Sequence, residues 1–128
     1  MAHVLIVDDD EISRVILGTI LQDAGHEVAY AGDGNAALAR IQRQAFDAVI
    51  TDLAMPEMNG LRLIQFLAET NGGTPVIAIS GQNAEQLLLA EDYGAVATLF
   101  KPVNPELLLN HLEAATRVSA NSWAGAWF

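Results

Sequence analysis

Near the middle of the chain, a short apolar segment ends on a carboxylate and runs into a tight loop: Phe46-Asp47-Ala48-Val49-Ile50-Thr51-Asp52-Leu53-Ala54-Met55-Pro56-Glu57-Met58-Asn59-Gly60. Val49 and Ile50 favour an extended strand, and Pro56 and Gly60 prevent the strand from continuing. We therefore expect a strand over Asp47–Thr51 that holds Asp52 at its carboxyl end. A lone aspartate after a strand is usually a turn former, so a function for Asp52 depends on what the rest of the chain brings to it.

Length and composition fit a single domain with a real core, since the chain has 128 residues of which 52% are hydrophobic. It has no cysteine, which excludes a disulfide framework and cysteine zinc sites. The apolar start before Asp8 is too short for a signal peptide or a membrane span, so we expect a cytoplasmic protein. The net charge of −10 argues against direct binding to nucleic acid, because binding to a duplex needs cations that displace counterions.

Apolar runs and helical patterns alternate along the chain. The apolar runs predict strands over residues 3–7, 27–31, 47–51, 74–80 and 95–100. Helical spacing predicts helices over about residues 11–24, 35–44, 60–70, 84–92 and 105–118. In the first helix we expect the apolar stripe to consist of Ile12, Val15, Ile16, Thr19 and Ile20. This alternation predicts an α/β fold: a doubly wound, five-stranded parallel sheet with helices on both faces.

Four of the expected strands end on polar or charged residues, namely Asp8 and Asp9, Asp52, Ser80 and Lys101. In an open parallel sheet, ligands bind beyond the carboxyl ends of the strands, where the strand order reverses. With the order 2-1-3-4-5, this point lies between the first and third strands. The aspartates should therefore meet there, flanked by one hydroxyl and one ammonium group.

Carboxylates that lie close together need a cation, because each pair at about 4 Å repels by roughly 4 kcal/mol at an effective dielectric of about 20. Mg²⁺ prefers oxygen ligands and keeps waters that a phosphate oxygen can replace. Lys101 and Ser80 are then suited to bind phosphoryl oxygens, and Asp52 is placed as a nucleophile toward phosphorus. Each residue alone has an ordinary explanation as a helix start, a turn or a surface lysine. Their joint placement at strand ends favours a shared site.

This constellation resembles the receiver domain of two-component response regulators, over about residues 3–118. The resemblance is carried by Val7-Asp8-Asp9, by Asp52 with the Met55–Gly60 loop, by Ser80-Gly81 and by Lys101-Pro102-Val103. It implies a flavodoxin-like (βα)5 fold and a cis peptide bond between Lys101 and Pro102. The domain would span residues 1–118, followed by an aromatic tail over residues 119–128.

The resemblance also implies a phosphorylation switch. Asp52 would accept a phosphoryl group from a phosphohistidine of a sensor histidine kinase or a histidine phosphotransfer protein. Mg²⁺ would be held by Asp9, Asp52 and the backbone carbonyl of Ala54, with Asp8 acting largely through a metal-bound water. Lys101 would pair with the phosphoryl group, and Ser80 would move toward it. Such a domain is not an enzyme in the usual sense, since it catalyses only its own phosphorylation and dephosphorylation.

Two positions depart from the receiver pattern. Receivers typically carry an aromatic residue three positions before the lysine, where this chain has Thr98. Phe100 lies next to Lys101, and we expect it to point to the other side of the strand, which places the usual aromatic readout in doubt. Gly81 stands where family members often have alanine, which could loosen the loop after the fourth strand.

Two leucine triplets and the tail are not explained by the resemblance. Leu87-Leu88-Leu89 and Leu107-Leu108-Leu109 cover more than one helical stripe, so at least one leucine of each should be exposed. They indicate either generous core packing or a homodimer or partner surface on the fourth helix, fifth strand and fifth helix. The tail contains Trp123, Trp127 and Phe128, and we expect it to pack on its own domain or on a neighbour.

Two other functions compete with a phosphorylation switch. One is a protein-interaction module that acts regardless of phosphorylation, which Thr98 favours and the complete acidic and lysine set opposes. The other is a phosphate hydrolase of related architecture that uses Asp52 as nucleophile. Ala54, in place of a second acidic residue, and the lack of a cap insertion argue against it. The sequence names neither a signal nor a downstream partner.

Overall fold

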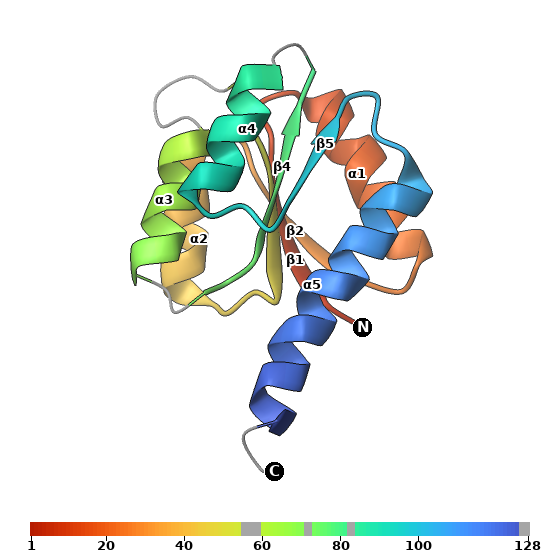
Figure 1. The fold of residues 1–128 in the computed structure, drawn as a ribbon. Helices are drawn as coiled ribbons and strands as arrows, with labels where there is room; N and C mark the ends of the chain where they lie inside the picture. The colour runs from red at the N-terminus through yellow and green to blue at the C-terminus, as the bar shows by residue number, and fades with distance from the viewer. Residues whose placement is uncertain (55–59, 71–72, 82–83, 126–128) are drawn as a thin grey trace.

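The computed structural model describes residues 1–54, 60–70, 73–81 and 84–125, and at residues 70 and 117–125 it describes the backbone alone. In this part of the chain, strands and helices alternate throughout (Figure 1). The elements are β1 (His3–Val7), α1 (Glu11–Asp23), β2 (Glu27–Ala31), α2 (Gly34–Arg43), β3 (Ala48–Asp52), α3 (Gly60–Thr70), β4 (Val76–Ser80), α4 (Ala84–Tyr93), β5 (Ala97–Phe100) and α5 (Pro105–Gly125). All paired strands are parallel, in the order β2-β1-β3-β4-β5. The predicted doubly wound α/β fold is confirmed.

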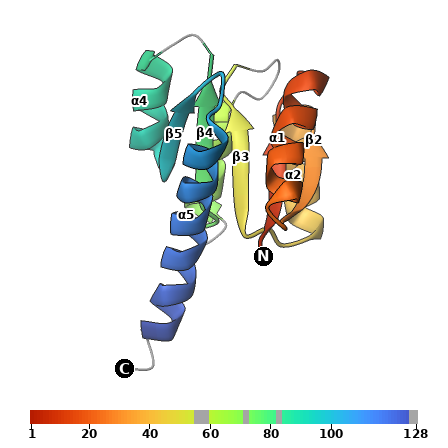
Figure 2. The ribbon, with the colours of Figure 1, turned by 90° about the vertical axis from the view of Figure 1, so that its right-hand side faces the viewer.

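Helices cover both faces of the sheet, with α1 and α5 on one face and α2, α3 and α4 on the other (Figures 1 and 2). Successive residues of a strand point to opposite faces, so β1 supplies both cores. Val4 and Ile6 pack with the buried leucines of α1 and α5, whereas Leu5 and Val7 pack with those of α3. Burial on both sides explains why the central strands read as unbroken apolar runs.

Several element bounds differ from those expected. β4 and β5 begin at Val76 and Ala97, later than predicted, and α5 continues to Gly125 rather than ending near residue 118. Ala95 is tied to the end of α4, since its N–H donates to the carbonyl of Ala90 at 2.8 Å. The last turns of α5 extend past the edge of the sheet (Figures 1 and 2). The predicted packing of the aromatic tail falls on side chains outside the described residues.

The predicted apolar stripe of α1 is wrong for most of its members, although Ile20 does pack against the core. Ile12, Val15 and Ile16 are 69%, 58% and 55% exposed, whereas Leu17 and Leu21 are buried. Gly18 lies on the buried side, where a Cβ atom would overlap the hydroxyl of Tyr30 in β2. α1 carries two apolar stripes, and helical spacing alone does not say which of them faces the sheet.

Each leucine triplet has one buried member and at least one exposed member, as expected. Leu87 and Leu108 are buried, while Leu88 and Leu107 are 63% and 48% exposed. Leu88 therefore lies on the surface of α4 and Leu107 on that of α5. Among the described residues, no helix is both long enough and apolar enough to cross a membrane.

Gly60 allows the start of α3 to approach the end of β3. A Cβ atom at this position would overlap the carbonyl oxygen of Asp52 and lie 2.8 Å from the Cα atom of Leu53. The Gly60 N–H also donates to the Leu53 carbonyl at 3.3 Å. The backbone that carries Asp52 is thus packed directly against the N-terminus of a helix, which only glycine permits at this distance.

We predict that Gly60→Ala lowers the free energy of unfolding by about 1–3 kcal/mol, because the added methyl group meets backbone that cannot move freely. Chemical denaturation measures this change. Gly81→Ala is the matched control, since its Cβ atom would meet Lys101 at an ordinary 3.7 Å and should cause no loss. Helix propensity alone predicts that alanine at residue 60 stabilises α3. A gain in stability at this position would therefore contradict the close-approach argument.

Candidate functional site

Three aspartates meet at the carboxyl edge of the sheet. Asp8 and Asp9 directly follow β1, and Asp52 is the last residue of the neighbouring strand β3, whose Thr51 pairs with Val7. One carboxylate oxygen from each aspartate lies within 4.8 Å of the others. Asp8 and Asp52 are 1% and 8% exposed, while Asp9 is exposed to solvent. The predicted acidic cluster is therefore present, with its two innermost carboxylates nearly removed from water.

Lys101, just after β5, reaches across this edge into the cluster. Its Nζ atom lies 3.0 Å from Asp8 Oδ2 and 3.4 Å from Asp52 Oδ2. The backbone N–H of Lys101 donates to the Ser80 carbonyl at 2.9 Å, which fixes where the side chain starts. The peptide bond between Lys101 and Pro102 is cis, as expected. One ammonium group thus partly neutralises two buried carboxylates.

Ser80 and Ala54 both lie close to Asp52 at the end of β3. Ser80 is the buried last residue of β4, one position beyond Ile79, the partner of Asp52 in the strand pairing. The backbone N–H of Ala54 donates to Asp52 Oδ1 at 3.3 Å, which orients that carboxylate. Residues 55–59, for which the sequence predicts a loop, lie outside the described part of the chain.

The pKa values of Asp52 and Lys101 are both raised, but for different physical reasons. Burial raises the pKa of Asp52 above its usual value of 3.8, and the nearby positive charge of Lys101 offsets this only in part. Burial acts to lower the pKa of Lys101, but the hydrogen bond from Lys101 to Asp8 and the charges of both aspartates outweigh it and raise this pKa. Lys101 therefore stays charged near neutral pH.

A hard divalent cation fits this donor set. The cluster offers three carboxylates, and the single ammonium group in contact with it is shared by Asp8 and Asp52. Carboxylate oxygens are the ligands that Mg²⁺ takes in proteins, usually with only one or two from the chain and the rest from water. Nitrogen and sulfur ligands, which zinc prefers, do not occur in the cluster.

The sequence interpretation missed the contacts by which three residues at the start of α1 hold the acidic segment. Asp10 caps the helix, since its Oδ1 atom accepts from the N–H of Ile12 at 3.3 Å. Ser13 donates to Asp10 Oδ2 at 3.0 Å, and Arg14 donates to the carbonyl of Asp8 at 2.7 Å. The pattern of an aspartate followed three residues later by a serine at a helix start is the signal that could have found the first two.

Thr98 and Phe100 lie on the same side of β5. Ala97 and Leu99 are buried against the α1 and α5 face, so the alternate residues Thr98 and Phe100 point the other way. The expectation that Phe100 points to the other side is therefore wrong with respect to Thr98. The Thr98 hydroxyl donates to Glu91 of α4 at 3.3 Å, and Phe100 is 55% exposed.

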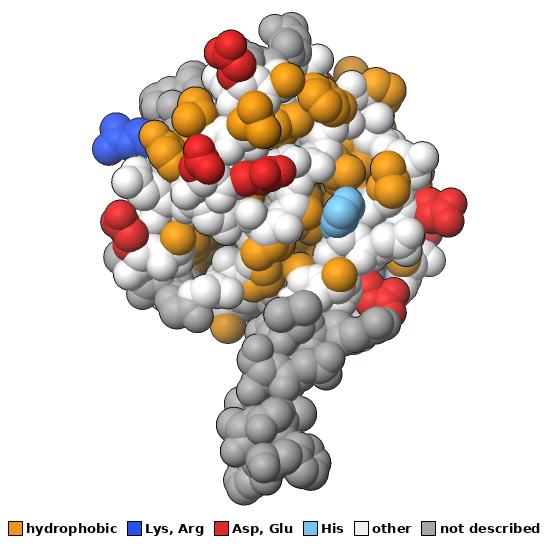
Figure 3. Space-filling view, viewed as in Figure 1, with side chains coloured by type: hydrophobic (Ala, Val, Ile, Leu, Met, Phe, Trp, Pro, Cys, Tyr) orange, Lys and Arg blue, Asp and Glu red, His pale blue; other side chains and the backbone are white. Residues whose placement is uncertain are grey.

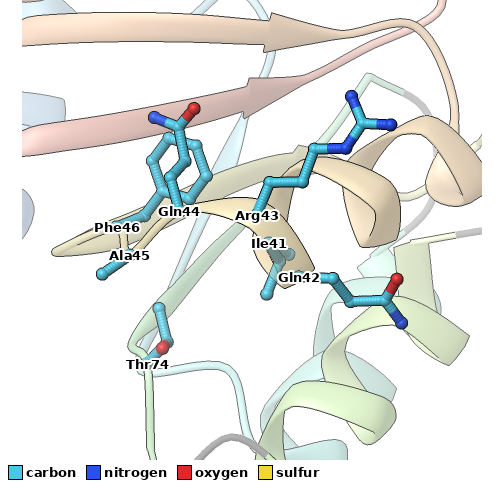
Figure 4. Close-up of a pocket in the computed structure, with 7 residues that line it drawn as sticks. All are labelled: Ile41, Gln42, Arg43, Gln44, Ala45, Phe46 and Thr74. Carbon is cyan, nitrogen blue, oxygen red and sulfur yellow. The ribbon is translucent and has the colours of Figure 1, made fainter.

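A surface hollow at the opposite end of the sheet does not belong to this site. It is lined by Ile41, Gln42, Arg43, Gln44, Ala45, Phe46 and Thr74, which come from the end of α2 and the segments that precede β3 and β4 (Figure 4). The side chains of Gln42 and Arg43 point in different directions and do not converge on a common point (Figure 4). The acidic cluster is therefore the stronger functional candidate.

We predict that Asp52→Asn raises the free energy of unfolding at pH 7 by about 1 kcal/mol in the absence of divalent cations. The pKa of Asp52 is raised in the fold, so its stabilising contribution is full below pH 3.8 and is lost as the pH rises through the folded value. The gain from asparagine should therefore shrink as the pH falls toward 3.8. Denaturation across this range measures it, with Asp23→Asn, at the exposed last residue of α1, as the charge-matched control. A gain that does not depend on pH would contradict the assignment.

Comparison with known proteins identifies a family. Residues 4–113 match the response regulator receiver domain. The transcriptional regulatory protein GlrR of Escherichia coli is 32% identical over 98% of this chain, which spans 29% of GlrR. The response regulator receiver protein Anae109_2439 of Anaeromyxobacter is 39% identical over 80% of this chain, which spans 44% of that protein. The chain thus spans less than half the length of these relatives.

Solved structures agree with this match. The chemotaxis protein CheY4 of Vibrio cholerae is 37% identical and superposes with a TM-score of 0.82, covering 90% of this chain and 98% of CheY4. NtrX of Brucella abortus is 31% identical with a TM-score of 0.91, covering 98% of this chain and 29% of NtrX. These likenesses agree with the observed strand order, and the chain belongs to the response regulator receiver domain family.

Proposed function

We propose that this chain is a phosphorylation switch in which Asp52 accepts a phosphoryl group from a phosphohistidine, in a reaction that depends on Mg²⁺. The donor would be a sensor histidine kinase or a histidine phosphotransfer protein. The observation that supports this most is the contact of Lys101 with both Asp8 and Asp52, within a cluster of three carboxylates at the carboxyl edge of the sheet. A site built only for stability would not gather three like charges there.

The residues divide the reaction among them. A carboxylate oxygen of Asp52 forms the new bond to phosphorus while the phosphorus–nitrogen bond of the donor breaks, and the electron pair leaves with the imidazole. Lys101 exchanges its contacts with Asp8 and Asp52 for a phosphoryl oxygen, and the Ser80 hydroxyl donates to another. Little covalent help is needed, because phosphoryl transfer depends mostly on positioning and charge neutralisation.

Asp9, Asp52 and the carbonyl of Ala54 would hold Mg²⁺, with Asp8 reaching it largely through water. When bound, the ion supplies charge neutralisation for the phosphoryl oxygens. Asp8 and Asp52 already form ion pairs with Lys101, so their negative charge is partly neutralised before any metal binds. Asp9 is exposed and open to solvent at the rim of the cluster, where an ion would enter.

We predict that incubation with a small phosphodonor gives a covalent phosphoryl adduct, detected by intact mass, that requires Mg²⁺. Asp52→Asn should abolish the adduct because no carboxylate remains at the acceptor position. The variant's folding is checked by its circular dichroism spectrum. An adduct of equal yield on Asp52→Asn would place the acceptor elsewhere. No adduct on wild type, from a small donor or a protein donor, would favour an interaction module that works without phosphorylation.

In the proposed reaction the phosphohistidine is carried by a second protein, which would contact the surface around Asp52. The exposed stripe of α1 consists of Ile12, Val15 and Ile16. It starts within one helical turn of the capping residue Asp10, which follows Asp8 and Asp9 of the acidic cluster. A protein that brings its phosphohistidine to Asp52 covers this neighbouring surface as well. An exposed patch of large apolar side chains next to a reactive group is typical of a protein interface. We propose that the donor packs on this stripe.

A second apolar surface lies over α4, β5 and α5, which Figure 3 shows as orange side chains interrupted by red ones. Leu88, Val96, Phe100 and Leu107 are each about half exposed or more. Glu85, Glu91 and Asp92 of α4 are also exposed on this helix. We propose that a second copy of the chain covers this surface in the phosphorylated state. Its acidic groups would repel their counterparts, so the pairing should strengthen with salt.

We predict that one serine substitution on each surface separates these two roles. Ile16→Ser on α1 should slow transfer from a phosphorylated histidine phosphotransfer domain by about tenfold, a hot-spot-sized loss, and leave loading by a small phosphodonor unchanged. Leu88→Ser on α4 should do the reverse, weakening self-association in sedimentation velocity with a phosphoryl mimic while sparing transfer. Each variant controls for the other. Equal effects of both variants on transfer would contradict the division.

A further inference from the structure

We infer that Ser13 of α1 is a positioning residue for Lys101, an inference that extends the proposed function to a residue outside the acidic cluster. Lys101 Nζ lies 3.4 Å from Ser13 Oγ, the same distance as from Asp52 Oδ2. The ammonium group is closest to Asp8, at 3.0 Å, with Ser13 and Asp52 as its two further partners. It can therefore turn toward either with a small movement.

The direction of these hydrogen bonds follows from the groups themselves. An ammonium group has only donors, so Ser13 must accept from Lys101 with a lone pair. The single hydroxyl hydrogen of Ser13 is then directed to Asp10 Oδ2, which lies 3.0 Å away and, as a carboxylate, only accepts. Asp10 itself is fixed as the N-cap of α1. These two hydrogen bonds link Asp10, Ser13 and Lys101. They orient the Ser13 hydroxyl so that its oxygen accepts from the ammonium group while α1 holds it in place.

Ser13 differs from the other two partners in what happens to them when the site is loaded. A divalent cation would bind near the negative charges of Asp8 and Asp52, and Asp52 would also accept the phosphoryl group. Ser13 is uncharged and belongs to neither event. It can keep one N–H of Lys101 occupied while the other two are transferred to a phosphoryl oxygen. Without Ser13 the ammonium group would either remain on the carboxylates or swing into solvent.

A purely structural role for Ser13 is the alternative, since its hydroxyl also supports the helix cap through Asp10. The two roles make different predictions for Lys101. A cap residue affects the stability of α1 and leaves the ammonium group where it is. A positioning residue changes the environment of that group without metal or phosphodonor. Lys101 is the only lysine in the sequence, so its side chain can be observed without interference from other lysines.

The experiment is nuclear magnetic resonance of metal-free protein labelled with ¹⁵N-lysine. We expect Ser13→Ala to shift the Lys101 Nζ signal and to speed its hydrogen exchange with water by about three- to tenfold, as for the loss of one hydrogen bond. Ser13→Thr keeps the hydroxyl and should restore the wild-type signal. Thr19→Ala, which removes an exposed hydroxyl from the same helix, is the matched control and should change nothing.

Phosphorylation of the same variants by a small phosphodonor with Mg²⁺ gives the second readout. Ser13→Ala should slow it by about three- to tenfold, and it should have no further effect in a Lys101→Ala background, because it acts through that lysine. An unchanged Lys101 signal in Ser13→Ala, together with lowered thermal stability, would overturn the inference. Ser13 would then have only the structural role of supporting the helix cap. A shifted signal in a protein whose wild type takes no phosphoryl group would support the contact and overturn the proposed function instead.

Discussion

The ion pairs of Lys101 with Asp8 and Asp52 hold together an edge that like-charge repulsion would otherwise push apart. Asp8 and Asp52 are both nearly buried, and burial raises the pKa of Asp52 because its charge is poorly solvated. Removing charges from water costs free energy that a single ammonium group only partly returns. The fold therefore carries a destabilised edge, which is the arrangement expected where a cation and an anionic group are to be bound.

The surrounding backbone keeps that edge in place. Asp52 ends a strand paired on both sides, and Gly60 brings the N-terminus of α3 against its carbonyl. Asp8 is held by Arg14 through its carbonyl, while Lys101 starts from a backbone hydrogen bond to Ser80. A hydrogen-bonded main chain is much less free to move than side chains. The carboxylates therefore cannot relieve their repulsion by moving apart.

The same organisation separates the surface into two apolar regions. The exposed stripe of α1 begins beside the acidic cluster, whereas the second region is formed by α4 and β5, which precede Lys101 in the chain, and by α5, which follows it. Thr98 is tied to Glu91, and Phe100 lies exposed on the same side of β5. A change at Lys101 is thus one residue from the second region, which gives a short physical route from the site to that surface.

The sequence alone determined the order of elements and the parallel sheet, because apolar runs and turn residues are local signals. It also determined which polar residues end the strands, namely Asp8, Asp9, Asp52, Ser80 and Lys101. Only the tertiary structure decided which stripe of α1 is buried, since Leu17 and Leu21 compete with Ile12 and Ile16 at equal helical spacing. It also decided the contact of Ser13 with Lys101, residues 88 positions apart in the chain. Such choices depend on distances across the fold, and no local pattern of residues contains them.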